Sequence, residues 1–489
     1  MSNKPDRNIE RTLIQGSIAE LRAHYLDKSL SVFDAVTWFQ SRIASVSHAV
    51  GPSGPAINAV REMSARALED ARLADAAIAD DQAHAPLLGI PVLLKDNILA
   101  AGMNATAGAA ALATFKPRQD AVLVRRLRAA GAIVLGKTNL TEFADFVSDV
   151  MPSGYSGAGG VVKNPHGIEY GRGQGSSVGS AASVAASLCM FAIGSETQNS
   201  IQTPASYSSV VGYKPGVGVV SRTGVVPLVP SQDSPGPLAR SVADAALVGW
   251  VLAGADIRDS ASLFAQGTLP GSLLGTGLAN VRIGVPRRQI ADREEFAGVM
   301  PLFEAALANL SRLGAKIVDP CDLPSAEQLQ EVRSCVFRTE FKAALNAFLE
   351  DHGSPCGIGS MHDLIAWNAA HPESIPYGQS LLIAANATNG VDDPVYRSDR
   401  ARDIALSRTA GIDAALAMHD CDVLIAPMGA AAKCTGKAGA PVVAIPCGVD
   451  KAGVPFGLTV FAGIGSDARL LAIAGAIERA VGERRLPRV

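Results

Sequence analysis

The chain alternates between short apolar runs and helical patterns from about residue 86, and this alternation restricts it to an α/β fold. The run 91–94 is continuously apolar and short, as in a strand buried on both faces. Residues 120–131 place apolar side chains three and four positions apart and end at a glycine, which predicts a helix. Another apolar run, 132–136, predicts a second strand directly after it. Helix and strand in alternation are typical of an α/β core.

Outside this core the sequence is predominantly helical in two stretches. Residues 1–85 carry three helical patterns, the last of which spans 57–79. Residues 290–420 are also mostly helical, and one pattern there runs through 326–351. We therefore divide the sequence into four parts of one structural domain. An N-terminal helical segment packed on the core (1–85) precedes the core that carries the chemistry (86–285). A mostly helical cap over the substrate region (286–420) and a C-terminal return to the core (421–489) follow.

Composition and charge exclude several classes of protein. Apolar residues make up 48% of the 489 residues and charged residues 18%, so the chain can bury a large core. The 43 Lys and Arg residues face 46 Asp and Glu, a net charge of −3, which argues against a nucleic-acid partner. The longest nearly unbroken apolar run, 181–193, is shorter than the ~18 residues of a membrane span. The N-terminus also lacks the apolar stretch of a signal peptide, so we expect a cytoplasmic protein with no membrane partner.

Two strings match known motifs in their letters only. Residues 131–138, GAIVLGKT, fit the Walker A spacing, but a helix is predicted before them and a strand where the phosphate loop belongs, which favours a helix–strand junction. Residues 175–179, GSSVG, fit the nucleophile elbow of α/β-hydrolases, but no strand precedes them and no later histidine has a catalytic context. The seven cysteines form no CxxC pair and no HExxH motif occurs, which argues against a disulfide framework and a zinc site.

Three features can carry hydroxyl-based chemistry together. Lys95 stands at the polar end of the apolar run 91–94, where burial lowers the pKa of a lysine towards a state that accepts a proton. The stretch 171–180 is rich in glycine and has two adjacent serines, and Ser200 lies in a second serine-bearing turn. Because no histidine is suitably placed, a hydroxyl nucleophile needs another base, and a desolvated lysine is available. These patterns alone leave open a solvated lysine and ordinary Ser/Gly turns.

The sequence resembles the amidase signature hydrolases, from about residue 15 to residue 480. The resemblance rests on a series of blocks in the order of the family: GIPVLLKDNI, AGAIVLGKTNLTEFA, NPHGIEYGRGQGSSVGSAASVAAS, IGSETQNSIQTPAS, VGYKP, VSRTGVVPL, SQDSPGPLARSVADAA and AGAPVVAIPCG. Such a run of ordered blocks is far more specific than any single motif. It implies an α/β amidase-signature fold, in which a large mixed β-sheet core is flanked by helices on both faces.

The resemblance also implies a Ser–cisSer–Lys triad. Lys95 matches the general base of the family, Ser176 the bridging serine that follows a cis peptide bond, and Ser200 the nucleophile. The oxyanion hole implied by the family is formed by backbone N–H groups, here those of Thr197, Gln198, Asn199 and Ser200. The implied reaction cleaves a C–N bond through an acyl-enzyme on Ser200. No cofactor and no metal are implied.

Three positions depart from the family pattern. Gln198 and Asn199 stand where the family usually has a Gly-Gly pair, and Gln202 replaces the usual arginine. All three side chains of the implied triad are present, which favours an active hydrolase. The alternative is a catalytically impaired member that acts as an amidotransferase-type or binding subunit. The segment 153–160 resembles the peptide-amidase and aryl-acylamidase-like subgroup.

The substrate is predicted only as a class. Phe146, Met151 and Tyr155 precede the serine block, and together with Gln202 we expect them to contact substrate, although core packing is an equally good interpretation of the first three. No acidic or basic cluster marks a pocket for a charged substrate. We therefore expect a small neutral amide of the aryl or alkyl type, an anilide or a carbamate (urethane), bound by a monomer or homodimer.

Overall fold

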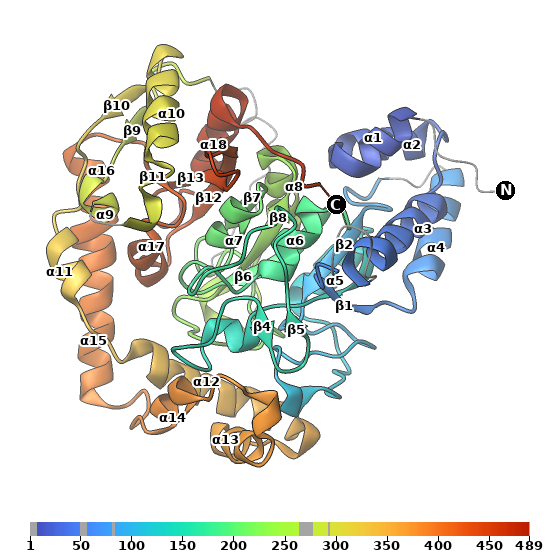
Figure 1. The fold of residues 1–489 in the computed structure, drawn as a ribbon, viewed down its shortest axis with the longest axis horizontal. Helices are drawn as coiled ribbons and strands as arrows, with labels where there is room; N and C mark the ends of the chain where they lie inside the picture. The colour runs from blue at the N-terminus through green and yellow to red at the C-terminus, as the bar shows by residue number, and fades with distance from the viewer. Residues whose placement is uncertain (1–6, 49–55, 81–83, 264–276, 292–293, 489) are drawn as a thin grey trace.

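The centre of the molecule is one eleven-stranded mixed sheet. The computed structural model describes residues 7–48, 56–80, 84–263, 277–291 and 294–488. The strands lie in the order β1-β3-β2-β6-β8-β7-β12-β13-β11-β9-β10 (Figure 1). Their bounds are Val60–Met63 (β1), Pro91–Lys95 (β2), Ile133–Thr138 (β3), Phe191–Glu196 (β6), Val211–Lys214 (β7), Ser234–Ala239 (β8), Arg282–Gly284 (β9), Lys316–Val318 (β10), Val423–Pro427 (β11), Val442–Val449 (β12) and Pro455–Phe461 (β13).

The two strands that lead to the predicted catalytic residues are neighbours in the middle of this sheet. β2 pairs in parallel with β3 on one side and with β6 on the other. Since parallel strands present their carboxyl ends at the same edge, Lys95 at the end of β2 and the chain leaving β6 at Glu196 emerge side by side. Helix α5 (Val122–Ala129) leads directly into β3, so the GAIVLGKT string is a helix–strand junction as predicted.

Helices cover both faces of the sheet. Along β7 a side chain at Gly212 would meet α7 (Gln202–Tyr207), whereas the next residue, Tyr213, contacts Gly249 of α8 (Val242–Leu252) on the opposite face. The Tyr213 hydroxyl also donates to Asp467 at the start of α18 (Asp467–Val481). Successive residues of a strand point to opposite faces, so α7 lies on one side of the sheet and α8 and α18 on the other. The predicted α/β fold with a mixed sheet between helices is confirmed.

The N-terminal part contains a strand that the sequence pattern did not predict. Its helices are α1 (Arg7–Gln15), α2 (Ile18–Leu26), α3 (Val32–Arg42) and α4 (Ala67–Ala79). The predicted helix over 57–79 is wrong in its first half, because β1 forms there and pairs antiparallel with β3. Gly136 on β3 has no side chain, which leaves room for the backbone of Glu62 to approach. Hydrogen bonding to the sheet edge thus overrides the local helical periodicity.

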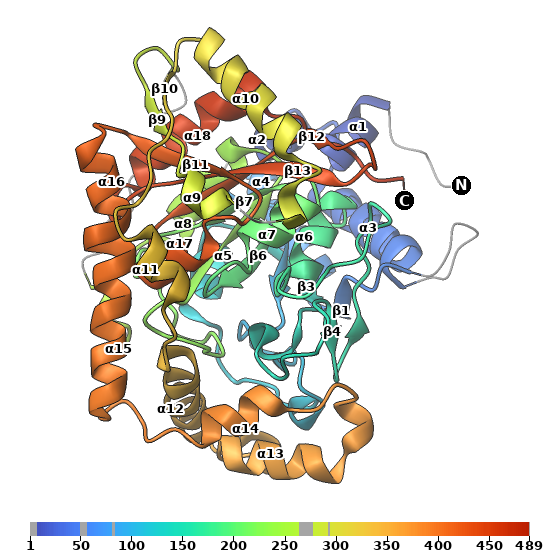
Figure 2. The same ribbon diagram turned by 60° about the vertical axis from the view of Figure 1, so that its left-hand side comes forward.

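A helical cap enters after β10 and returns to the sheet at β11. Figures 1 and 2 show α12–α14 at one end of the molecule and α15 along its side, away from α1–α4. The helices are α11 (Ala326–Glu331), α12 (Val336–Asp351), α13 (Met361–Ala370), α14 (Ser380–Asn386), α15 (Pro394–Ile404) and α16 (Asp413–Met418). The predicted pattern over 326–351 is two helices, because Asp399 accepts the Cys335 amide at 2.8 Å and starts α12 afresh.

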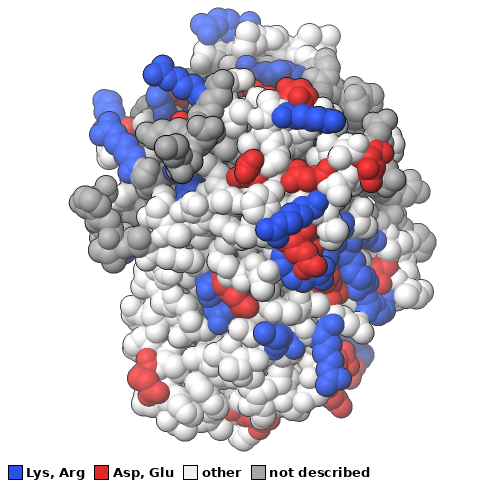
Figure 3. Space-filling model, turned by 90° about the vertical axis from the view of Figure 1, so that its right-hand side faces the viewer, with Lys and Arg blue, Asp and Glu red and all other residues white. Residues whose placement is uncertain are grey.

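Charged side chains are mixed on the face shown in Figure 3, where basic and acidic groups alternate and broad areas carry neither. No helix among the described residues is long and apolar enough to cross a membrane.

Candidate active site

Lys95 is fully buried at the end of β2 and has only uncharged hydrogen-bond partners. Its Nζ lies 2.7 Å from Ser176 Oγ, 3.0 Å from Ser195 Oγ and 3.1 Å from the Ser195 carbonyl oxygen. A neutral amine can donate to the two Ser195 atoms and accept the hydroxyl hydrogen of Ser176 with its lone pair. The ammonium form makes the same three contacts by donating to all three oxygens, so the pKa decides which form is present.

The electrostatic environment favours that neutral form. Burial lowers the pKa of Lys95 to about 7. The carboxylates of Asp233, Glu196 and Asp145 act in the opposite direction, but their effect is smaller than that of burial. A lysine with this pKa exists to a large extent as the free amine near neutral pH, which is the state a general base requires.

Ser176 is held by the chain on both of its sides. The peptide bond between Gly175 and Ser176 is cis. The Ser176 carbonyl accepts the Thr141 amide at 3.1 Å, and the Gly175 amide donates to Ser153 Oγ at 3.0 Å. A side chain at Gly175 would collide with the Thr141 hydroxyl, so this position requires glycine. These contacts aim the Ser176 hydroxyl at Lys95.

Ser200 lies in the turn between β6 and α7, next to the start of α6 (Val178–Ala185). Its carbonyl accepts the Ser177 amide at 3.1 Å, which joins the turn to the serine block. Its side chain is almost completely buried, with 4% of the residue exposed. The structure therefore brings Lys95, Ser176 and Ser200 from three distant segments into one region at the edge of the sheet.

The turn before Ser200 has free backbone donors. Among the hydrogen bonds between described residues, none uses the amide N–H of Thr197, Gln198, Asn199 or Ser200. Neither Gln198 nor Asn199 has a positive φ angle, so the replacement of the family's glycines places no left-handed residue in the turn. The Asn199 side chain donates to the carbonyl of Gly173 and ties the turn to the segment before Ser176.

Glu196 and Gln202 support the same turn from inside. The Glu196 carboxylate accepts the amides of Ile201 at 2.6 Å and Gln202 at 2.9 Å, and also Gln202 Nε2 at 2.6 Å. Burial raises the pKa of Glu196, and the charge of Lys214 together with these hydrogen bonds lowers it in part. Gln202 also donates to the Gln198 carbonyl at 3.1 Å. Its amide is thus directed into the turn.

Helix α17 (Ala432–Ala438) packs closely on the outside of the turn. A side chain at Gly436 would lie 2.8 Å from Gln198 Cα and 2.9 Å from the Thr197 carbonyl oxygen. These are backbone atoms, so the contact requires glycine. The position of the free amides therefore depends on a helix more than 230 residues further along the chain.

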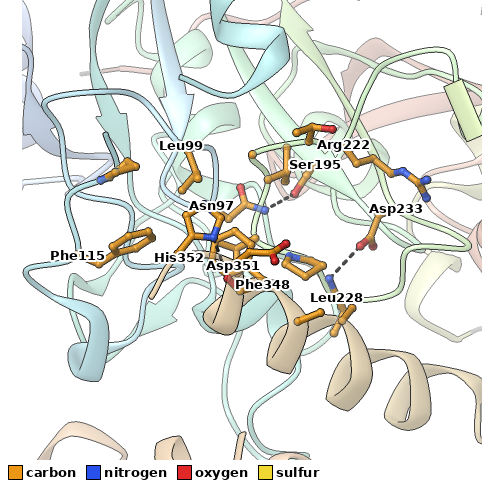
Figure 4. Close-up of a pocket in the computed structure, with 18 of the residues that line it drawn as sticks. Asn97, Leu99, Phe115, Ser195, Arg222, Leu228, Asp233, Phe348, Asp351 and His352 are labelled. Carbon is orange, nitrogen blue, oxygen red and sulfur yellow. Dashed lines mark hydrogen bonds between the residues drawn. The ribbon is translucent and has the colours of Figure 1, made fainter. Parts of the chain in front are cut away.

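A cavity of about 1380 Å³ is lined by Ser195, whose hydroxyl contacts Lys95, and by Thr197 of the turn; Figure 4 shows Ser195 in its wall. Its polar end is lined by Asn97, Ser195, Thr197 and Asp233, where Asn97 Nδ2 donates to Ser195 Oγ at 2.9 Å and Thr197 Oγ1 donates to Asp233 at 2.5 Å. The rest of its lining includes apolar side chains from the core and from α12 of the cap, among them Leu99, Phe115, Leu228 and Phe348. The cavity thus extends from Ser195 and Thr197 to the cap, whereas Lys95, Ser176 and Ser200 themselves are not among the residues that line it.

Comparisons with known proteins identify the family of the chain. The Amidase family model matches residues 42–437. The chain is 33% identical to a probable amidase of Arabidopsis thaliana, with 97% of this chain and 91% of that protein covered. The chain belongs to the amidase family. It is also 32% identical to a glutamyl-tRNA(Gln) amidotransferase subunit of Ralstonia pickettii, with 95% and 97% covered.

The fold comparison points to the same family. The crystal structure of a peptide amidase from Stenotrophomonas maltophilia superposes with a TM-score of 0.88 at 39% sequence identity, covering 96% of this chain and 98% of that one. An amidase family protein from Bacillus anthracis gives a TM-score of 0.89 at 29% identity, covering 100% of this chain and 96% of that one. The amidase-signature resemblance predicted from the ordered sequence blocks is confirmed.

The four residues expected to contact substrate lie outside the cavity lining that the structure describes. Phe146 packs between the rings of Phe337 and Phe341 of α12. Met151 is buried, and the ring of Tyr155 meets that of Tyr377 edge to face with centroids 5.0 Å apart. Substrate contact by these residues of the amidase-family chain stays a prediction.

Sequence reasoning missed several residues around Lys95, chiefly Asn97, Ser195 and Asp233. Ser195 stands directly before Glu196 in the block that contains Ser200, but only the pairing of β2 with β6 shows that it contacts Lys95. Asp233 reads from the sequence as a turn residue. It accepts the amides of Leu228 and Val229 at 2.9 Å each, and it also faces the cavity. Within the described parts of the chain, no group of three or more His, Cys, Asp or Glu side chains is placed to hold a metal ion.

Proposed function

We propose that this amidase-family protein hydrolyses the C–N bond of neutral amides through an acyl-enzyme on Ser200. The observation that carries the proposal is the contact of 2.7 Å between Ser176 Oγ and a fully buried Lys95 whose hydrogen-bond partners are all uncharged. Lys95 takes the hydroxyl proton of Ser176, which takes the proton of Ser200 as Ser200 Oγ attacks the amide carbonyl. The free amides of the turn bind the oxyanion, and the same relay returns the proton to the leaving amine. Water then hydrolyses the acyl-enzyme.

The charge of the cavity supports a neutral substrate. Four basic side chains (Lys116, Arg118, Arg222 and Arg258) and four acidic ones (Asp120, Asp233, Asp259 and Asp351) line it, so neither sign dominates. Its volume exceeds the roughly 300–1,000 Å³ of ordinary small-molecule pockets, which accommodates an aryl or alkyl amide, an anilide or a carbamate. We include carbamates and esters as side substrates, because the acyl-transfer steps are the same.

The proposal is tested by treatment with a fluorophosphonate probe, which marks activated serines, followed by intact mass and peptide mapping. We expect one adduct on Ser200, which is lost in Ser200→Ala and in Lys95→Ala. Ser183→Ala is the matched control, because Ser183 is an equally buried serine whose hydroxyl has no hydrogen-bond partner among the described residues. An adduct that persists in Ser200→Ala would assign the nucleophile elsewhere.

A second candidate function is that of an amidotransferase-type subunit, which the identity to the glutamyl-tRNA(Gln) amidotransferase relatives favours. The two functions differ in what the isolated chain does. A hydrolase turns over amides, anilides or carbamates alone. A labelled Ser200 without turnover of any of them by the isolated chain would support the second function instead.

A further inference from the structure

Three aromatic rings from separate parts of the fold meet in the wall of the cavity, where Lys116 and Asp351 also line it. Phe115 belongs to the core, on the loop that follows a short helical turn at Ala110–Leu112, whereas Phe348 and His352 lie at the end of α12 in the cap. All three line the cavity, and Figure 4 shows them grouped beside Leu99. We call these three residues the aromatic wall.

The rings of the aromatic wall present both faces and edges. Phe348 and His352 are stacked with centroids 4.3 Å apart and an angle of 28° between their planes. Phe115 stands edge-on to both, at 6.3 Å and 85° from Phe348 and at 5.7 Å and 79° from His352. Aromatic groups prefer such offset-stacked and edge-to-face arrangements, so a further ring added to the cluster finds favourable geometry.

Two contacts fix the aromatic wall, one within the end of α12 and one between the core and the cap. His352 Nδ1 donates to the Phe348 carbonyl at 2.8 Å, which fixes the imidazole on the helix end. Thr114 Oγ1 lies 3.3 Å from Cys356 Sγ, which links the residue before Phe115 to the cap segment after α12. The rings are therefore positioned before any ligand binds, so little conformational entropy is lost on binding.

We propose that the aromatic wall is a binding subsite for an aryl group of the substrate, remote from the bond that is cleaved. This inference rests on the proposed amide hydrolysis, because the polar end of the same cavity reaches Ser195 and Thr197 beside the candidate catalytic residues. The lining of the same cavity also includes Leu99, Val225 and Leu228, which suit an apolar linker. The substrate class is thus a neutral amide that carries an aromatic ring at a distance from its carbonyl.

The test compares two amides that differ only in aromaticity, 4-phenylbutanamide and 4-cyclohexylbutanamide. Their chains and amide groups are identical, and the cyclohexyl ring is the larger and more apolar of the two, so simple burial favours it and a preference for phenyl reports aromatic contacts. We expect the wild-type protein to prefer the phenyl compound in kcat/KM by about 2- to 10-fold, the range expected for aromatic pairing beyond burial. In Phe348→Leu and Phe115→Leu this ratio should fall towards 1. His352 is exposed, so His352→Leu is the variant that disturbs folding least, and we expect it to lower the phenyl-to-cyclohexyl ratio by a smaller amount.

The control is Phe33→Leu, the same substitution on α3, where the ring lies under the guanidinium of Arg72 outside the described cavity lining. It should keep the wild-type ratio. If the phenyl-to-cyclohexyl ratio of kcat/KM is unchanged in the Phe115, Phe348 and His352 variants, the aromatic wall is not the binding site of the aryl group. If the preference for the phenyl compound is lost in Phe337→Leu instead, the aryl group binds at Phe146, because the rings of Phe146 and Phe337 are in contact.

The outcome is separable from that of the proposed function. Turnover that disappears in Ser200→Ala tests the hydrolase, whereas the ratio tests the subsite. If neither amide is turned over, isothermal titration of Ser200→Ala and of Ser200→Ala/Phe348→Leu with the two amides gives the same comparison for binding. Equal affinity for both amides, or no binding of either, would overturn the subsite.

Discussion

Lys95 shows how burial and hydrogen bonding act together at one residue. It is surrounded by hydroxyls and a carbonyl, and the nearest carboxylates influence it through space without a direct contact. A carboxylate within hydrogen-bonding distance would stabilise the ammonium form and remove the base. The arrangement of neutral partners therefore keeps the free amine accessible near neutral pH.

A pH dependence follows from this. Because burial lowers the pKa of Lys95 to about 7, the base is protonated below that value and free above it. We expect kcat/KM for a neutral amide to rise about tenfold per pH unit below pH 7 and to level off above it. The profile is measured between about pH 5 and 9, with circular dichroism at each pH to show that the fold persists. A rate that stays constant on both sides of the Lys95 pKa would contradict Lys95 as the base.

At the scale of elements, α17 connects the turn before Ser200 with the cap. Gly436 packs on the turn that carries the free amides, whereas Lys437, the next residue, forms a buried ion pair with Asp403 of α15 in the cap. Lys433 also donates to the Gln330 carbonyl of α11 at 2.9 Å. One seven-residue helix thus touches both the turn and the cap.

The substitution Gly436→Ala, which adds one methyl group, tests whether the turn before Ser200 depends on its contact with α17. Gly436→Ala places a carbon against the backbone of Gln198 and Thr197, so the turn must move. We expect kcat to fall about 10²–10³-fold, the loss that accompanies a misplaced oxyanion donor. The free energy of unfolding should fall by only about 1–3 kcal/mol, the usual cost of one extra carbon in a packed contact, so the protein stays folded. Gly277→Ala, at a position with open space around it, is the control and should keep full activity.

The order of the sequence blocks predicted the family, the mixed sheet and the neighbourhood of Lys95, Ser176 and Ser200. Lys95, Ser176 and Ser200 lie within residues 90–200, where the strand and turn signals are local, and the later blocks extend the match to the rest of the sheet. The role of α17 was not predictable, because nothing in residues 432–438 indicates that they pack on a turn at residue 198. The edge strand β1 was missed for a similar reason, since its partner Gly136 lies more than 70 residues away.

At the scale of the whole molecule, the cap is fastened to the core by a buried charge pair. Lys437 Nζ lies 2.5 Å from Asp403 Oδ2, and Asp403 also accepts the Ser334 hydroxyl at 2.8 Å. Both Lys437 and Asp403 are almost fully buried. Removal of one partner would leave the other charge without compensation in the interior.

Lys437→Met should therefore lower the free energy of unfolding by about 3–5 kcal/mol, measured by urea denaturation. The double variant Lys437→Met/Asp403→Asn should recover part of this loss, because no buried charge remains. Arg397→Met removes an exposed ion pair with Asp392 in the same cap and should cost less than about 1 kcal/mol. If Lys437→Met and Arg397→Met lower the free energy of unfolding by the same amount, burial does not strengthen the Lys437–Asp403 pair.

The route of the chain through the cap has a consequence for how such proteins diversify. The cap helices form one uninterrupted stretch, 326–418, which leaves the sheet after β10 and rejoins it at β11. The strands that hold Lys95 and the turn before Ser200 lie in a different part of the sheet, closer to its middle. A single exchange of that stretch between related genes would thus replace one wall of the cavity and leave the segments that carry Lys95, Ser176 and Ser200 in place.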